Sequence, residues 1–520
     1  MIEILILVSV GLISRFFLVN KGDVDFDTYG HLYFAKEIKR QKVGPVGEIK
    51  PQVISPEKFR QPFLWHWMVG TLSLSFFYKY KKWINAALDV AFGMSLYGAS
   101  ILYGFDFKFS FWLVILYYFT PIWFSGISTG PRIKSLTPRI TSEIALNWLY
   151  ILLLFSEALP LWIVLSGTLI LGVFVLLSSK FGIQAFLFIT PLIALFSLNI
   201  LPIISLIGSI LVAIIVTKGN FIKNLSFQLN HLIWYFKKNI KGEMAISNRN
   251  SIDKLISSFK TNKPFYKKLA NAVIKALSLN SFIAVLFKMP IYVLALALTG
   301  FGYFQLPEPF SELFVVPVIA ASILYVFINI PYFLFLGEAE RYLNHVSFFI
   351  VGLFMYQIDK FDLYSVVYLL TIYGFLYWVF EAFILHRLKG SFGILNRKAL
   401  EEKNIMSFLQ KNNKTQKVLC FPYHAVGIWR IMYETVHVPL FPLLSTKPFA
   451  KDFEEKYGAN YPYVKLDRLD DMASEYEIDI LIIENKSLEI QSLPDWKVSS
   501  KWVPLDLGCK LFSVFKYKNS

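Results

Sequence analysis

The sequence predicts an all-α, multi-span membrane domain followed by a small C-terminal soluble α/β domain. Of its 520 residues, 55% are hydrophobic and only 17% are charged, whereas soluble proteins carry roughly 25% charged residues. Apolar runs recur from Ile2 to Leu385, and about 18 such residues suffice for a helix to cross the roughly 30 Å hydrocarbon core. We expect about 11 transmembrane helices plus interfacial helices in residues 1–388, and the soluble domain in residues 389–520.

The apolar runs set the order of the predicted spans. The first span, about Ile2–Leu18, has no basic n-region and no cleavage site, so we interpret it as retained. A polar first loop, residues 20–82, contains the apolar stretch Phe63–Tyr78, which is short for a span and fits a helix at the interface or dipping into the membrane. Further spans are expected at about Trp83–Gly104, Phe109–Ile127, Ile140–Phe155, Leu161–Leu177, Phe181–Leu198, Leu201–Val216, Phe282–Phe304, Leu313–Leu336, Val346–Ile358 and Leu363–Leu385.

A basic loop, residues 217–281, interrupts the series of spans. It carries twelve Lys or Arg residues between Lys218 and Lys275, against only Glu243 and Asp253. Apolar residues recur in it at helical spacing, which predicts amphipathic helices on a membrane surface.

The C-terminal segment changes character after about Arg387. Val418–Phe421, Ile478–Ile483 and Leu511–Tyr517 read as short strands, and Asp470–Tyr476 as part of a helix. The segment shows no repeat and no catalytic motif.

The net charge of +16 is unevenly distributed between the two ends of the predicted spans. If Phe63–Tyr78 does not cross, the first loop, the 128–141 loop, Lys180, the basic loop, the 337–341 turn and the tail share one face. The positive-inside rule would make that face cytoplasmic; alternatively, the charge serves phosphate-bearing substrates and the face is extracytoplasmic. In a third arrangement Phe63–Tyr78 spans, and only the later basic loops and the tail lie inside.

The first loop carries an acidic motif directly after the first span. It reads Gly22-Asp-Val-Asp-Phe-Asp-Thr-Tyr-Gly-His-Leu-Tyr-Phe-Ala-Lys-Glu-Ile-Lys39. This acidic segment, followed by Tyr, His and an amphipathic turn, resembles the GT-C superfamily of glycosyltransferases, which includes oligosaccharyltransferases, protein mannosyltransferases and aminoarabinose transferases. The resemblance implies a catalytic acid in the first extracytoplasmic loop and a polyprenyl-phosphate or polyprenyl-diphosphate sugar donor. Asp27 is the candidate base that takes the proton of the attacking acceptor, with Asp25 as a second acid; a solvated acidic loop is the simpler alternative.

The resemblance extends to further turns in the superfamily's order. Pro62 and His66 stand where the superfamily often has a Pro-rich helix start, and the 128–143 segment looks like its second acidic loop, or simply a basic loop with a capping acid. The turns around Lys180 and Arg341 resemble a Lys-Gly turn and an Arg-Tyr turn that touch the lipid phosphate. The candidate catalytic residues are therefore Asp27, Asp25 and Glu143, and the candidate substrate-binding residues are Arg132, Arg139, Lys180, Arg341, Tyr342, His66 and His231.

These residues imply a membrane glycosyltransferase that moves a sugar from a lipid-linked donor to an unknown lipid, glycan or protein acceptor. The chain lacks the Trp-Trp-Asp-Tyr-Gly motif of oligosaccharyltransferases, which argues against transfer to asparagine. A transporter or flippase, or a polymerase or ligase, for a phosphorylated lipid-linked glycan is the alternative. Mg²⁺ or Mn²⁺ could bind Asp25, Asp27 and Glu143, although the balance favours a reaction without metal. We expect the lipid bilayer rather than nucleic acid as partner, and a multi-pass location in a bacterial inner (plasma) membrane.

Overall fold

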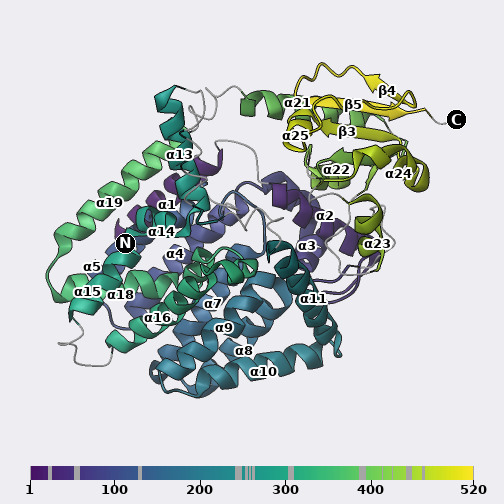
Figure 1. Ribbon diagram of the computed structural model, residues 1–520. Helices are drawn as coiled ribbons and strands as arrows, with labels where there is room; N and C mark the ends of the chain where they lie inside the picture. The colour runs from purple at the N-terminus through teal and green to yellow at the C-terminus, as the bar shows by residue number, and fades with distance from the viewer. Residues whose placement is uncertain are drawn as a thin grey trace.

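The chain forms a helical bundle with a small sheet domain beside it (Figure 1). This computed structural model describes residues 2–20, 26–51, 59–126, 132–240, 249–251, 256, 259, 264–302, 310–385, 394–412, 414–423, 425–440, 448–458 and 463–518.

Long apolar helices make up the bundle, so the chain is a multi-pass membrane protein. Five helical segments are long and apolar enough to span, or up to seven if two bent helix pairs each count as one. The expected count of about 11 is therefore not confirmed, because several expected spans are short or broken. Phe107–Phe119, for example, ends at Thr120, before Pro121 begins a separate short helix. The bundle comprises α1 (Ile2–Asn20), α4 (Ile84–Leu102), α5 (Phe107–Phe119), α6 (Pro121–Phe124), α7 (Arg139–Leu154), η1 (Ser156–Ala158), α8 (Leu161–Ser178), α9 (Lys180–Phe196), α10 (Leu201–Val216), α15 (Pro290–Gly302), α16 (Phe310–Ile328), α18 (Ser347–Lys360), α19 (Tyr364–Val379) and the π-helical turn η5 (Phe380–Leu385).

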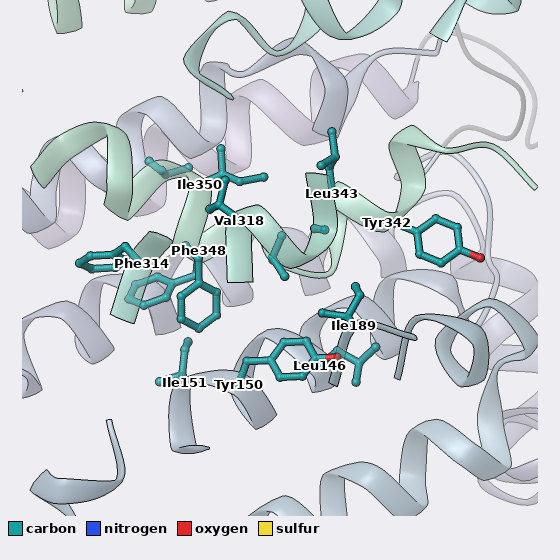
Figure 2. Close-up of a cluster of buried hydrophobic side chains, with 14 of the residues drawn as sticks. Leu146, Tyr150, Ile151, Ile189, Phe314, Val318, Tyr342, Leu343, Phe348 and Ile350 are labelled. Carbon is teal, nitrogen blue, oxygen red and sulfur yellow. The ribbon is translucent and has the colours of Figure 1, made fainter. Parts of the chain in front are cut away.

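The bundle core lies between α7, α9, α16 and α18 (Figure 2). Tyr150 of α7, Phe314 of α16 and Phe348 of α18 are fully buried there. Figure 2 shows Tyr342 at the edge of this cluster, on the short helix α17 (Glu340–Asn344), which precedes α18. The packed core thus fixes the position of the turn that carries Arg341.

Two helices of the first loop, α2 (Phe26–Gln41) and α3 (Leu64–Tyr80), pack against each other. A Cβ atom on Gly70 of α3 would lie 2.7 Å from the backbone oxygen of Ala35 on α2, so the glycine permits a close crossing. Helix α3 breaks at Ser73, whose φ of −173° and ψ of 99° are not helical. With 17 residues it is not among the candidate spans.

The basic loop forms amphipathic helices, as predicted, and they turn sharply against their neighbours. Helix α11 (Asn220–Ile240) bends by 113° from α10, and α13 (Phe265–Leu279) bends by 98° from α14 (Ser281–Lys288). The side chain of Asn280 accepts a hydrogen bond from the backbone N of Ile283 and caps α14. The short helix η4 (Pro331–Leu336) lies against α11.

The C-terminal segment folds around a five-stranded mixed sheet in the order β2-β1-β3-β5-β4. Strand β1 pairs in parallel with β2 and β3, whereas β5 pairs antiparallel with β3 and β4. The three predicted strands and the predicted helix are confirmed, and two short edge strands were missed. The elements are α21 (Ile394–Lys411), β1 (Lys417–Phe421), α22 (Ile428–Glu434), β2 (Val438–Pro439), α23 (Pro448–Tyr457), η6 (Leu466–Arg468), α24 (Leu469–Tyr476), β3 (Ile480–Glu484), α25 (Asn485–Ile490), β4 (Trp502–Leu505) and β5 (Phe512–Tyr517).

One apolar cluster joins the sheet domain to the first loop. Tyr33 and Phe34 of α2 belong to the same buried cluster as Leu419 of β1 and Ile428 of α22. The ring of Trp429 packs over Gly30, where an added Cβ would lie 3.1 Å from the indole. The C-terminal domain therefore rests directly on the helix that carries Asp27.

Candidate active site

A cavity of about 170 Å³ lies where the first loop meets the ends of four bundle elements. Helices α2 and α3 form one wall, and the segment before α7, the α8–α9 junction and α17 form the others. Five of the ten candidate site residues named from the sequence line it, although they are spread over more than 300 positions of the chain. The lining residues are Asp27, His31, Gln61, Pro62, His66, Ser135, Thr137, Pro138, Arg139, Ser178, Ser179, Lys180, Phe181 and Arg341.

Asp27 supplies the cavity's carboxylate. It lies in the first turn of α2, and its side chain is exposed. The positive end of the helix dipole favours the ionised form of a carboxylate at this position. Residues four apart share one helix face, so Asp27 and His31 face the cavity together.

Three cations surround the same cavity. Lys180 begins α9, which Ser179 caps by accepting a hydrogen bond from the backbone N of Gly182 over 3.1 Å. The guanidinium of Arg341 lies 4.6 Å from the centre of the Phe181 ring. Among the described residues no carboxylate lies within ion-pairing distance of Lys180, whereas Arg139 and Arg341 each have a glutamate partner. The cavity is therefore suited to a multiply charged anion such as a phosphate.

Glu143 and Arg132 support the cavity from behind. Arg139 donates from Nε to Oε1 of Glu143 over 3.2 Å, and Arg132 pairs with the other carboxylate oxygen of Glu143. Glu143 is completely buried and Arg132 is 4% exposed. Neither residue lines the cavity, and direct contact of Arg132 with a ligand stays a prediction. Both residues fix the position of Arg139.

The ion-pair network continues into the bundle. Arg132 also pairs with Asp89 and donates from Nη2 to the hydroxyl of Tyr117 over 3.1 Å. Asp89 in turn accepts a hydrogen bond from Arg15. Because removing charge from water is costly, buried charges persist where each is paired. The carboxylates of Asp89 and Glu143 balance two of the three guanidinium charges in this network. The remaining positive charge lies on Arg139, at the cavity.

Two other substrate-binding candidates lie outside this cavity. The Tyr342 ring is 2% exposed, and its hydroxyl donates to Oε1 of Gln184 over 3.3 Å, so it fills the core beside Arg341. His231 lies on α11 with its ring 6.1 Å from that of Trp234. Asp25 lies outside the described residues.

His31 lines the cavity. It stands in the acidic first-loop motif but was not among the predicted site residues. Its Nδ1 lies 2.7 Å from Nε2 of His66, and the two rings stack with centroids 5.0 Å apart. Burial, together with the nearby charge of Lys180, lowers the pKa of His31 to about 3. Burial, followed by the charges of His31 and Lys180, holds the pKa of His66 well below its usual range. Both imidazoles are therefore neutral at pH 7. The four-residue spacing between Asp27 and His31 in one helix was the sequence signal that could have identified His31.

The metal hypothesis fits the cavity poorly. Both oxygens of Glu143 are paired with arginines, which excludes it as a cation ligand in this arrangement. Within the described ranges, no group of three His, Cys, Asp or Glu side chains has the spacing of a metal site. We therefore derive no chemical step through a metal.

The fold is similar to solved structures of an oligosaccharyltransferase from Archaeoglobus fulgidus. The crystal structure of that enzyme tethered to an acceptor peptide with the NVT sequon aligns with a TM-score of 0.51 at 12% identity, covering 100% of this chain and 74% of the other. Its apo form aligns with a TM-score of 0.49 at 12% identity, covering 93% and 69%. The complex of the archaeal enzyme with an inhibitory peptide and a dolichol-phosphate aligns at 0.45 and 12%, covering 94% and 69%.

No protein-family model and no curated protein matches the sequence. The alignment with the peptide-tethered crystal structure nevertheless shows that the chain shares the fold of an oligosaccharyltransferase, a GT-C protein. The resemblance drawn from the first loop is thus confirmed as a resemblance of fold.

Proposed function

We propose that this protein is a membrane glycosyltransferase that moves a sugar from a polyprenyl-phosphate or polyprenyl-diphosphate donor to a lipid, glycan or protein acceptor. The observation that carries the proposal is the cavity in which Asp27 faces Lys180, Arg139 and Arg341. One carboxylate opposite several cations is the arrangement required to activate a hydroxyl and to stabilise a leaving phosphate.

Asp27 acts as the general base in this proposal. A sugar or protein hydroxyl is a poor nucleophile until a positioned base takes its proton. As the hydroxyl oxygen forms its bond to C1 of the sugar, the bond from C1 to the phosphate oxygen breaks. Asp27 is exposed within the cavity and can therefore reach an incoming acceptor.

The three cations bind the phosphate and stabilise the charge that develops on it. A charged hydrogen bond is stronger than a neutral one, and among the described residues no carboxylate forms an ion pair with Lys180. The guanidinium groups of Arg139 and Arg341 are held by Glu143 and Glu338, so they are positioned before the donor binds.

The archaeal structure with the related fold carries an acceptor peptide with an asparagine sequon. The present chain lacks the Trp-Trp-Asp-Tyr-Gly motif, so the acceptor class is left open between lipid, glycan and protein. We place the protein in a bacterial inner membrane, with the cavity on the face that receives the lipid-linked donor.

The proposal is tested by incubating purified protein, in lipid nanodiscs, with undecaprenyl-phosphate-linked radiolabelled hexose and a lipid and glycan extract as acceptor. Transfer and the release of undecaprenyl phosphate are both measured. Asp27→Asn should lower the turnover by roughly a hundredfold or more, whereas Glu157→Gln, a change in an exposed acid remote from the cavity, should not. Equal turnover of the Asp27→Asn variant and the wild type would eliminate Asp27 as the base. Binding of the donor without any release of lipid phosphate would instead favour a transporter.

A further inference from the structure

A second group of charges meets the turn that carries Arg341, and the proposed reaction does not use it. Arg249 comes from the basic loop, and its side chain is only 2% exposed. Its two terminal nitrogens reach two glutamates of that turn: Nη2 lies 2.5 Å from Oε1 of Glu340, and Nη1 lies 4.0 Å from Oε1 of Glu338. Glu338 pairs with Arg341 through its other oxygen. Arg249 itself does not line the cavity.

The residue after Arg249 fixes the same stretch of the basic loop to the bundle. Asn250 donates from its backbone N to the backbone oxygen of Leu279 over 2.9 Å, and its Oδ1 accepts a hydrogen bond from the backbone N of Ser281 over 2.8 Å. Its Nδ2 donates to Oδ1 of Asn329 over 3.0 Å. Asparagine tolerates the left-handed conformation found here, with a φ of 60°. Arg249 is therefore held in place by the α13–α14 junction as well as by its glutamates.

Glu340 is the main partner of Arg249. Burial alone would raise the pKa of Glu340, but the charge of Arg249 and the hydrogen bond that it donates lower this pKa, so the carboxylate is ionised at pH 7. Its Oε2 accepts a hydrogen bond from the hydroxyl of Ser281 over 3.0 Å. Buried charges persist where each is paired. The Arg249–Glu340 pair therefore keeps the guanidinium of Arg249 beside Glu338.

Glu338 consequently lies between two guanidinium groups. Its Oε1 faces Arg249, and its Oε2 pairs with Arg341. Attraction to Arg249 restrains Glu338 from one side, and this restraint fixes the oxygen that holds Arg341. The charge of Arg249 also offsets part of the negative potential of Glu338, so Arg341 attracts an anion in the cavity more strongly than an isolated ion pair would.

We propose that Arg249 is a positioning residue for the phosphate site. It acts through Glu338 to hold the guanidinium of Arg341 in the geometry that binds the phosphate of the lipid-linked donor. The basic loop, to which the proposed reaction assigns no role, thereby supports the site from within the bundle. The inference rests on the proposed function, because that function identifies the ligand of Arg341 as the donor phosphate.

The decisive variant removes Arg249 without leaving its main partner as an unpaired buried charge. In Arg249→Met/Glu340→Gln both charges of the pair disappear together, and replacing both partners costs far less stability than removing one. The measurement is the equilibrium binding of radiolabelled undecaprenyl phosphate to the protein in lipid nanodiscs, which requires no turnover. Thermal unfolding reports whether each variant is folded.

We expect Arg249→Met/Glu340→Gln to raise the Kd for undecaprenyl phosphate by roughly tenfold, with an unfolding midpoint close to that of the wild type. The control is Lys398→Met/Glu484→Gln, because that pair is 2.7 Å apart in the C-terminal domain and does not line the cavity. The control should bind as the wild type does. A wild-type Kd in the Arg249 variant would overturn the positioning role.

A second comparison separates positioning from general packing. The same two substitutions are introduced into Arg341→Ala. If Arg249 acts through Arg341, the Kd of the combined variant equals that of Arg341→Ala, which is the result we expect. If the two effects multiply instead, Arg249 supports the site independently of Arg341, and the proposal is overturned.

Arg249→Lys provides a variant that keeps the buried positive charge if the double variant does not fold. An ammonium is a point charge and lacks the fork with which the guanidinium reaches both glutamates. We expect weaker binding of undecaprenyl phosphate than in the wild type, and an unchanged Kd would overturn the proposal.

Binding also distinguishes a failure of this inference from a failure of the proposed function. A wild type that binds undecaprenyl phosphate but releases none from the donor would overturn the glycosyltransferase, while the comparison of Kd values would still decide the role of Arg249. A wild type that does not bind undecaprenyl phosphate would overturn both.

Discussion

Arg15 donates a hydrogen bond from Nε to Oδ2 of Asp89 over 2.5 Å, and both side chains are completely buried between α1 and α4. Arg15 also donates to the backbone oxygen of Tyr118 over 2.7 Å. Asp89 is shared with Arg132, whose pairing with Glu143 positions Arg139 at the cavity. Arg139 is therefore anchored by charges deep in the bundle.

This anchoring predicts a large stability loss for Asp89→Asn. The change leaves two buried arginines without their shared carboxylate, and removing one partner of a buried pair costs about 3–5 kcal/mol. Thermal unfolding in detergent should show a clearly lower midpoint. Asp471→Asn is the control, because Asp471 is 65% exposed in its pair with Arg468 and should leave the midpoint unchanged. Equal midpoints for both variants would contradict the role of the network.

The close crossing of α2 and α3 predicts opposite effects for two glycine substitutions. Gly70→Ala would place a Cβ 2.7 Å from a backbone oxygen of α2, whereas an added Cβ at Gly98 of α4 has no neighbour within 4 Å. We expect Gly70→Ala to cost about 1–3 kcal/mol, because it forces α2 and α3 apart. Gly98→Ala should be neutral or stabilise by up to about 1 kcal/mol. The same unfolding measurement compares them, and a stabilising Gly70→Ala would show that the helices are not packed this closely.

Local patterns were sufficient to predict much of this fold. The strands at 417–421, 480–484 and 512–517 and the helix at 469–476 are short apolar or amphipathic segments whose periodicity is visible in the sequence. The span count was not predictable in the same way. Runs such as 282–304 and 313–336 are largely apolar, but the chain breaks at Met289 and again after Ile328, so each run becomes two elements.

For the site, short sequence motifs predicted the residues that line the cavity but not the distant residues that pair with buried charges. Asp27, Arg139, Lys180 and Arg341 were selected from individual turns, and the fold brings them to one cavity. Arg15 and Glu381 lie near the ends of apolar runs, where long charged side chains commonly reach to the membrane interface, but both are buried and paired inside the bundle. Arg15 finds Asp89 at a distance of 74 positions along the chain, and Glu381 pairs with Lys134 over 3.5 Å. A single sequence does not reveal such partners, because the polar residue that satisfies a buried charge can come from any element.

The position of Lys180 in the wall of the cavity predicts a strong effect of Lys180→Ala on donor use. Losing a charged hydrogen bond to phosphate costs about 1.5–3 kcal/mol, which corresponds to a fall in kcat/KM of roughly tenfold to a hundredfold. Lys108→Ala is the matched control, because that ammonium lies 3.4 Å from the centre of the Tyr364 ring, away from the cavity. The measurement is initial-rate kinetics with varied undecaprenyl-phosphate hexose. If both lysine variants keep the kcat/KM of the wild type, Lys180 does not bind the phosphate.

The two neutral histidines predict that the folded protein loses stability on acidification. In the unfolded chain a histidine takes up a proton near pH 6.5, whereas burial and Lys180 lower the pKa of His31 to about 3 in the folded chain. Between these values the unfolded state binds more protons, so the free energy of unfolding falls as the pH falls, by up to about 1.4 kcal/mol per pH unit for each histidine. The contribution is complete above pH 6.5. Unfolding midpoints measured from pH 7 to pH 5 should therefore decline, and the decline should be shallower in His31→Asn/His66→Gln. An identical decline in both proteins would show that His31 and His66 already titrate in the folded state, and would remove the basis for treating the pair as neutral.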